Sequence, residues 1–110
     1  MNRFLKSMAG RRKTVTYGEL MKRFHLSRGP ALSRAIARAD EMEYSVGAPG
    51  FAAIIVRKDT RYPGGGFFCD EGLPASLRRP LSRSSDPRLS VAERSYVRKL
   101  QGRIWASYSR

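Results

Sequence analysis

The stretch of residues 15–44 constrains the fold more than any other part of the sequence, because it specifies where two helices begin. Thr16, followed three residues later by Glu19, forms a capping box, and Val15 and Leu20 occupy the two hydrophobic staple positions around it. A helix should therefore begin at Tyr17. Its apolar residues recur at helical spacing and predict one buried face, made of Tyr17, Leu20, Met21 and Phe24.

A second helix is expected after a short bend. Gly29 suits the bend and Pro30 suits the first position of a helix, so we expect a helix from Pro30 to about Tyr44. Its apolar positions predict a buried face made of Leu32, Ala35, Ile36, Ala39 and Met42. Two helices joined by a short turn that contains Gly are typical of a helix-turn-helix.

Short elements are expected around this pair. Residues 2–9 favour a short helix closed by Gly10, and residues 14–16 favour a small edge strand. The apolar run FAAIIV (51–56) predicts a buried strand, and FF (67–68) predicts its hairpin partner. This order of elements predicts an α+β fold, namely a winged helix-turn-helix with three helices and a small β-hairpin wing.

The predicted wing is the loop KDTRYPGGG (58–66) between those strands. Pro63 and Gly64 suit positions i+1 and i+2 of a type II turn. A turn does not require the charged and aromatic side chains that the loop also carries, which are Lys58, Arg61 and Tyr62. We interpret these three as a contact to a polyanion, with a plain hairpin turn as the alternative.

The C-terminal part of the sequence divides into two segments. Residues 74–89 are rich in Pro, Ser and Arg, which predicts a basic linker that cannot pack a core. Ser90 and Glu93 form a second capping box before a helix of about 18 residues, with Trp105 at the border of its apolar face. That face consists of Val97, Leu100, Ile104 and Tyr108. The expected division is a winged-helix domain (1–73), a linker (74–89) and a C-terminal helix that packs on the domain (90–110).

The charge of the chain points to a polyanionic partner. The formal net charge is +13 and the isoelectric point is about 11.1, which favours nucleic acid and, less often, an anionic membrane surface. Residues 1–13 hold five Lys or Arg and no acid, and residues 74–110 hold nine against two. Residues 14–73 hold eight against seven, so this middle part needs segregated basic residues to form a binding face.

Such segregation is visible on the second predicted helix, whose acids Asp40, Glu41 and Glu43 all come late. The N-terminal half of a helix favours phosphate through its dipole. Near that half, the polar face and the preceding turn carry Arg28, Ser33, Arg34 and Arg38. The loop after the strand would add contacts to the backbone or minor groove through Arg57, Lys58, Arg61 and Tyr62. The alternative is that Arg34 and Arg38 are ordinary solvated helix residues.

The sequence offers no persuasive catalytic constellation, so we expect a protein that is not an enzyme and uses no metal or cofactor. His25 is the only histidine and Cys69, predicted to be a structural thiol, is the only cysteine. Asp70 and Glu71 precede Gly72 and are more typical of a solvated turn than of a cation site.

No segment predicts a membrane partner. The longest apolar run is far shorter than the roughly 18 residues that span a bilayer, and the first residues lack the apolar stretch of a signal peptide. We expect a cytoplasmic, nucleoid-associated protein.

Three features resemble the winged-helix DNA-binding domain of the O6-alkylguanine DNA alkyltransferases and their alkyltransferase-like relatives. They are VTYGEL (15–20), the Arg34-Ala35-Ile36 step and the strand at 54–56. In that family the tyrosine after the cap helps rotate a base out of the duplex and the arginine of the second helix fills the gap, which implies these roles for Tyr17 and Arg34. The family's Pro-Cys-His-Arg motif is absent, because Val56-Arg57-Lys58 stands at its place. The resemblance therefore implies a docking geometry and no chemistry.

Most of the chain also resembles a family of small, functionally uncharacterised bacterial and phage proteins. The resemblance rests on a TYGEL helix, a V-x-K-x-T strand end, a PGxGFF segment and a C-terminal helix with Glu and Trp. The matching positions are Thr16 to Leu20, Val56, Lys58, Thr60, Pro63, Gly64, Gly66, Phe67, Phe68, Glu93 and Trp105. It implies one compact unit that includes the last helix.

Three hypotheses of function follow. The leading one is a nonenzymatic winged-helix protein that binds duplex DNA through a basic helix and a wing. The first alternative is a protein-interaction or inhibitory module of a phage or mobile element, which binds a protein partner through Trp105 and Tyr108. The second alternative is an RNA-binding protein, because small Arg-rich chains suit ribonucleoproteins.

Overall fold

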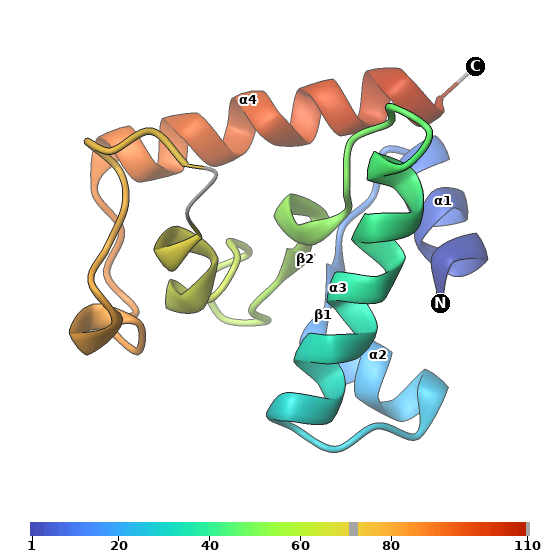
Figure 1. The fold of residues 1–110 in the computed structure, drawn as a ribbon, viewed down its shortest axis with the longest axis horizontal. Helices are drawn as coiled ribbons and strands as arrows, with labels where there is room; N and C mark the ends of the chain where they lie inside the picture. Colours follow the sequence, from blue (N-terminus) through green and yellow to red (C-terminus); the bar gives the residue numbers. More distant parts are fainter. Residues whose placement is uncertain (71–72, 110) are drawn as a thin grey trace.

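The computed structural model describes residues 1–70 and 73–109, so parts of the predicted solvated turn (Glu71 and Gly72) and of the C-terminal segment (Arg110) lie outside the described residues. The helices are α1 (Asn2–Gly10), α2 (Tyr17–Phe24), α3 (Pro30–Tyr44) and α4 (Val91–Tyr108). The strands are β1 (Val15–Thr16) and β2 (Ile55–Val56), and the 3₁₀ helices are η1 (Ala52–Ile54), η2 (Gly65–Cys69) and η3 (Leu81–Arg83). Figure 1 shows α4 along one side of the molecule. The C-terminal end of α3 lies near the C-terminal end of α4, and the rest of α3 extends away from α4. The predicted α+β class is confirmed.

The starts of α2 and α4 are confirmed as capping boxes. Thr16 Oγ1 accepts a hydrogen bond from the Glu19 backbone N–H at 3.1 Å, and Glu19 Oε1 accepts one from the Thr16 N–H at 3.3 Å. Ser90 and Glu93 repeat this arrangement at 3.0 and 2.8 Å. Both predictions hold because a capping box depends only on residues three positions apart.

The predicted β-hairpin is wrong in the described residues. β2 pairs with β1 and not with residues 67–68, the pairing is parallel, and Val15 lies opposite Ile55. Residues 67–68 belong to η2, and most of the predicted strand 51–56 is taken up by η1. Parallel strands need a long crossover connection, which α2 and α3 supply here.

The chain after β2 closes into a tight loop. The Arg61 N–H donates to the Arg57 carbonyl at 2.9 Å, and the Arg57 N–H donates to the Tyr62 carbonyl at 2.9 Å. Gly64 has φ −65° and ψ 164°, so the predicted type II turn, which needs a positive φ at this position, is wrong. The positive φ of this loop belongs to Arg61, at 61°. The loop therefore ends the strand early and removes the basis for a hairpin.

α3 buries most of the predicted face and two acids in addition. Ala35 and Ile36 are half-buried, and Ile36 packs against the main core. Leu32 and Ala39 are buried as expected, but the Met42 side chain is 59% exposed. Asp40 and Glu43 are instead only 7% and 3% exposed. Each carboxylate has a partner within the chain. Asp40 Oδ1 accepts a hydrogen bond from the Phe51 N–H at 2.5 Å, and Lys6 Nζ forms an ion pair with Glu43 Oε1 at 3.1 Å.

The segment 73–89 takes part in a second, smaller core. Phe68, Leu73 and Val97 are buried there, and Leu77 and Leu89 pack against them. Arg79, within the predicted linker, is only 7% exposed. The expectation that this segment cannot pack a core is therefore wrong, because Leu77, Leu89 and the buried guanidinium of Arg79 provide packing that its composition does not suggest.

α4 packs against α1 and η1. Ile104 joins the main core and Val97 the smaller one, in agreement with the predicted apolar face. Gln101 is fully buried on this face, and its Nε2 donates to the Ala53 carbonyl at 2.9 Å. This hydrogen bond satisfies a carbonyl at the 3₁₀ helix that precedes β2, so α4 also fixes the position of that strand.

Candidate nucleic-acid interface

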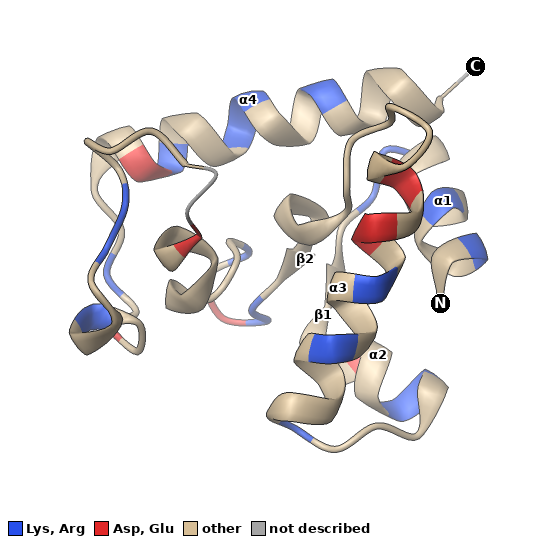
Figure 2. Ribbon diagram, in the orientation of Figure 1, with Lys and Arg blue, Asp and Glu red and all other residues tan. Residues whose placement is uncertain are grey.

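The basic residues predicted around α3 are all exposed. We call Arg28, Ser33, Arg34 and Arg38 the α3 basic face. Arg34 and Arg38 lie one helical turn apart, and Figure 2 shows the two blue segments of α3 on one side of the helix. Within the described residues, neither forms an ion pair. Two guanidiniums are therefore available to an anionic partner.

Two of the three acids near the C-terminal end of α3 do not contribute to its exposed surface. Of the three late acids, Asp40 and Glu43 are buried, and only Glu41 is exposed. Burial raises the pKa of the Asp40 carboxyl, although the backbone N–H groups of Phe51 and Ala52 oppose this effect. At about 100° per residue, Asp40 and Glu43 project onto the side of α3 away from Arg34 and Arg38, whereas the exposed Glu41 lies three residues after Arg38 on the same side.

The N-terminus of α3 carries no side-chain cap. Gly29 occupies the cap position with φ 102°, a backbone conformation that favours Gly, and Pro30 follows as the first helical residue. The first N–H groups of a helix are therefore not covered by a side chain here, and they lie at the positive end of the helix dipole. This end, together with Arg28, suits contact with a phosphate group.

The 57–62 loop offers two free cations and one compensated cation. Arg57 forms a two-point pair with Asp59, with Nε–Oδ1 at 3.0 Å and Nη2–Oδ2 at 2.8 Å. Its hydrogen bonds hold the pKa of the Asp59 carboxyl below its usual value. Lys58 and Arg61 are exposed and, within the part of the chain that the structure describes, form no ion pair. Of the predicted loop cations, these two best suit a phosphate backbone.

Tyr17 has a structural contact that the sequence does not predict. Its hydroxyl oxygen accepts a hydrogen bond from the Gly64 N–H at 3.0 Å, which ties the start of α2 to the chain just after the 57–62 loop. Burial raises the pKa of this phenol, while the Gly64 hydrogen bond and the nearby Arg57 oppose the rise. The base-rotating role implied by the first resemblance stays a prediction, and it would require this bond to break.

Tyr62 is half-buried and is held by α4. The Arg98 guanidinium carbon lies 4.3 Å from the centre of the Tyr62 ring, and Arg98 Nε donates to the Tyr62 hydroxyl at 3.2 Å. The two residues are 36 positions apart, so no local spacing could reveal their contact. Arg98 is thus a residue near the candidate interface that the sequence did not identify.

The predicted site residues fall into two groups. Tyr17, Arg57 and Tyr62 belong to the group around the 57–62 loop, with Lys58 and Arg61. The α3 basic face forms the other group. In residues 1–70 and 73–109, no hydrogen bond or ion pair joins the two groups, so each presents its charges independently.

Trp105 and Tyr108, the residues predicted to contact a protein partner, are turned towards the protein itself. Trp105 Nε1 donates to the Lys13 carbonyl at 3.2 Å, and the Tyr108 hydroxyl donates to the Pro49 carbonyl at 2.7 Å. The Tyr108 ring also lies 5.2 Å from that of Phe51, between centres. Burial and the nearby Glu43 carboxylate raise the pKa of Tyr108 to about 12. These contacts explain both aromatics through packing.

The described part of the chain contains no helix long and apolar enough to cross a membrane. Among the same residues, no three His, Cys, Asp or Glu side chains gather as metal ligands would. Comparison with protein-family models, with curated proteins and with solved structures found no match to this chain.

Proposed function

We propose that this protein binds duplex DNA without catalysing a reaction, with the α3 basic face in a groove and the 57–62 loop on the sugar-phosphate backbone. The observation that carries the proposal is the pair Arg34 and Arg38. Both are exposed and lie one turn apart on α3, and the acids Asp40 and Glu43 on the same helix are buried. A nucleoid-associated location would follow from this activity.

The dimensions of α3 support insertion into a groove. With its 15 residues, α3 is about 22 Å long at 1.5 Å per residue. The major groove admits an α-helix, and Arg is the side chain that most often reads guanine there. In this arrangement Arg34, Arg38 and Ser33 would face base edges or phosphates, and the uncapped N-terminus of α3 would face the backbone.

The 57–62 loop would act where a winged-helix protein uses its wing. Although it is no β-hairpin, it carries Lys58 and Arg61 without acidic partners in the described residues. The bond between Tyr17 and Gly64 ties the chain just after this loop to α2, which would be the first helix of the proposed helix-turn-helix. Leu20 of α2 and Leu32 of α3 belong to the same core, so α2 contacts both parts of the proposed interface.

A charge-reversal experiment tests the proposal. We expect Arg34→Glu with Arg38→Glu to abolish duplex binding, measured by fluorescence anisotropy at low salt, and to leave the thermal midpoint nearly unchanged because both side chains are exposed. The matched control is Lys99→Glu with Arg103→Glu, which changes the charge equally at the same spacing on α4. Equal losses in both double variants would mean that total charge alone drives binding. Tighter binding of structured RNA than of duplex DNA would favour an RNA-binding protein instead.

One observation favours a protein partner as the second candidate. Beyond the basic face, the C-terminal end of α3 and the residues after it expose three large apolar side chains, which are Met42, Tyr44 and Val46 at 59%, 60% and 75%. Large exposed apolar side chains can contribute to a contact with a protein partner, and these three follow one another at every second position of the sequence. A complex that survives nuclease treatment and high salt, and is lost on Met42→Ser with Val46→Ser, would support this candidate.

A further inference from the structure

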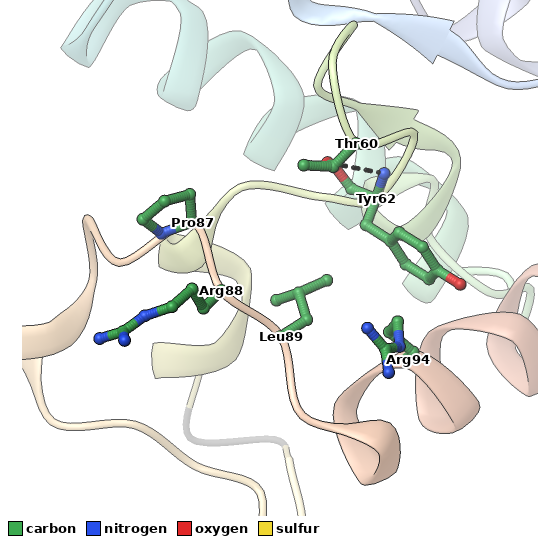
Figure 3. A pocket seen from close by; sticks show the side chains of 6 residues that line it. All are labelled: Thr60, Tyr62, Pro87, Arg88, Leu89 and Arg94. Atoms are coloured by element: carbon green, nitrogen blue, oxygen red, sulfur yellow. Dashed lines mark hydrogen bonds between the residues drawn. The ribbon is translucent and has the colours of Figure 1, made fainter.

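A pocket of about 340 Å³ lies where the 57–62 loop faces the chain that leads into α4. Figure 3 shows Thr60 and Tyr62 on one side of it and Pro87, Arg88 and Leu89 on the other, with Arg94 from the first turns of α4 below. Its volume is at the lower end of the range for small-molecule sites. The pocket is distinct from the α3 basic face, since it shares none of its residues.

The wall formed by Tyr62 is fixed before any ligand arrives. Arg98 contacts both the ring and the hydroxyl of Tyr62. The Thr60 hydroxyl accepts a hydrogen bond from the Tyr62 N–H at 3.2 Å, which holds the backbone. Because the aromatic side chain is already ordered, a ligand that packs on it pays little conformational entropy.

The two arginines of the pocket differ in their availability. Arg88 is paired with Asp86, with Nε–Oδ1 at 3.2 Å. Arg94 is exposed and forms no ion pair within residues 1–70 and 73–109. In Figure 3 the Arg94 side chain rises towards the ring of Tyr62 and towards Leu89. The pocket therefore combines one available cation with an apolar wall made of an aromatic ring, a proline and a leucine.

We propose that this pocket binds one unpaired nucleotide, with the base against Tyr62, Pro87 and Leu89 and the phosphate on Arg94. Proteins that bind single strands combine aromatic side chains, on which bases pack, with cations that follow the backbone. A paired base is stacked inside its duplex and cannot enter such a pocket. The nucleotide can come from a single strand or be free in solution, and the site goes beyond the duplex contact proposed for α3.

Binding of fluorescein-labelled oligothymidylate of eight nucleotides to the full chain tests this site. We expect Arg94→Gln to weaken binding about tenfold, the effect of one lost charge-assisted contact, and the control Arg103→Gln to weaken it less than twofold. Tyr62→Leu should weaken it about fivefold or more through loss of base packing. If Tyr62→Leu lowers the thermal midpoint, its loss of binding can reflect unfolding. The Arg94→Gln variant then decides whether the pocket binds the oligonucleotide, because the Arg94 side chain is exposed and its removal should not unfold the protein. Equal effects of Arg94→Gln and Arg103→Gln would overturn the assignment.

Two further arms identify the source of the nucleotide and separate this proposal from the previous one. Displacement of the oligonucleotide by millimolar thymidine 5′-monophosphate would support the site and show that a free nucleotide is a sufficient ligand. If the mononucleotide does not displace the oligonucleotide but Arg94→Gln still weakens binding more than Arg103→Gln, the site is supported with a single strand as its ligand. The Arg34→Glu/Arg38→Glu variant should keep its oligothymidylate affinity within about threefold. Abolished oligothymidylate binding in that variant would place single-strand binding on α3 and overturn the pocket.

Discussion

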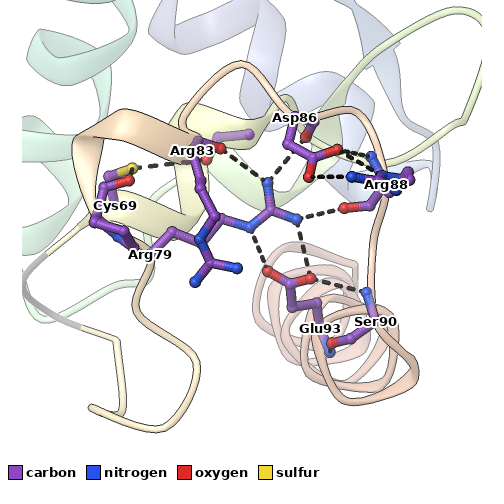
Figure 4. Close-up of polar contacts among 9 residues, drawn as sticks. Cys69, Arg79, Arg83, Asp86, Arg88, Ser90 and Glu93 are labelled. Atoms are coloured by element: carbon purple, nitrogen blue, oxygen red, sulfur yellow. Dashed lines mark hydrogen bonds and ion pairs between the residues drawn. The ribbon is translucent and has the colours of Figure 1, made fainter.

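Arg79 and Glu93 form a buried two-point ion pair: Nε lies 2.6 Å from Oε2 and Nη2 lies 3.0 Å from Oε1. The same guanidinium donates to the backbone carbonyls of Arg83, Asp86 and Arg88 (Figure 4). Glu93 Oε1 also accepts the Ser90 N–H of the capping box. One pair thus joins the segment before α4 to the first turn of that helix.

Arg79→Ala should lower the free energy of unfolding by about 3–5 kcal/mol, because it leaves a buried carboxylate without its cation and the carbonyls of Asp86 and Arg88 without the donor that Arg79 supplies. Urea unfolding measures the change. Arg83→Ala is the control, since the Arg83 side chain is exposed and only its carbonyl serves the network. We expect less than about 0.5 kcal/mol for this control. A loss below about 1 kcal/mol for Arg79→Ala would show that the pair contributes little.

Substitution by alanine should affect protein stability differently at two adjacent glycines of the GGG segment, Gly65 and Gly66. A Cβ at Gly65 would collide with the backbone carbonyl of Ser84, whereas a Cβ at Gly66 would meet nothing within 4 Å. We expect Gly65→Ala to destabilise the protein by about 1–3 kcal/mol through overpacking. Gly66→Ala should be close to neutral. Thermal unfolding of both variants checks the contrast, and similar midpoints would mean that the 84–85 turn can move away.

The loop cations should be visible in the salt dependence of duplex binding. If about six phosphates are contacted, log K should fall against log salt with a slope near −5. Lys58→Ala with Arg61→Ala should weaken binding and reduce the slope by about 2, without unfolding, because both side chains are exposed. The positive φ of Arg61 strains Ala no more than Arg. Affinity and slope equal to those of the unmodified protein would leave the loop without a role in binding.

Tyr108 should make the stability of the protein fall at alkaline pH. Its pKa is raised to about 12 in the folded protein against 10.0 in an exposed phenol, so the folded state keeps a proton that the unfolded state has lost. The corresponding stabilisation is complete below pH 10.0 and is lost as the pH rises towards 12. Tyr108→Phe should remove this dependence and, through loss of the hydrogen bond to the Pro49 carbonyl, cost about 1 kcal/mol at neutral pH.

Chemical unfolding of both proteins across that pH range measures the effect. The advantage of the unmodified protein over Tyr108→Phe should shrink as the pH rises from 10.0 to 12. A constant difference between the two proteins would contradict the raised pKa.

The candidate interface was partly readable from the sequence. The exposure of Arg34 and Arg38 followed from helical spacing once the start of the helix at Pro30 was known. The burial of Asp40 and Glu43 did not follow, because it depends on the Phe51 N–H and on Lys6, which are distant in sequence. The pocket beside Tyr62 could not be predicted from the sequence either, because Arg94 and Arg98 belong to α4 and are distant from Tyr62 in sequence.

The sequence by itself determined the helices. The capping boxes at Thr16 and Ser90, Pro30 at the start of α3 and the apolar spacing act within a few residues, so they set helix bounds before any tertiary contact forms. Only the tertiary structure decided how the strands pair, because the apolar run at 51–56 suits a forward hairpin with 67–68 and a parallel pairing with β1 equally well. It also decided that Arg79 is buried, since a guanidinium can leave water only where a carboxylate and several carbonyls meet it, and here they come from segments on both sides of Ser90.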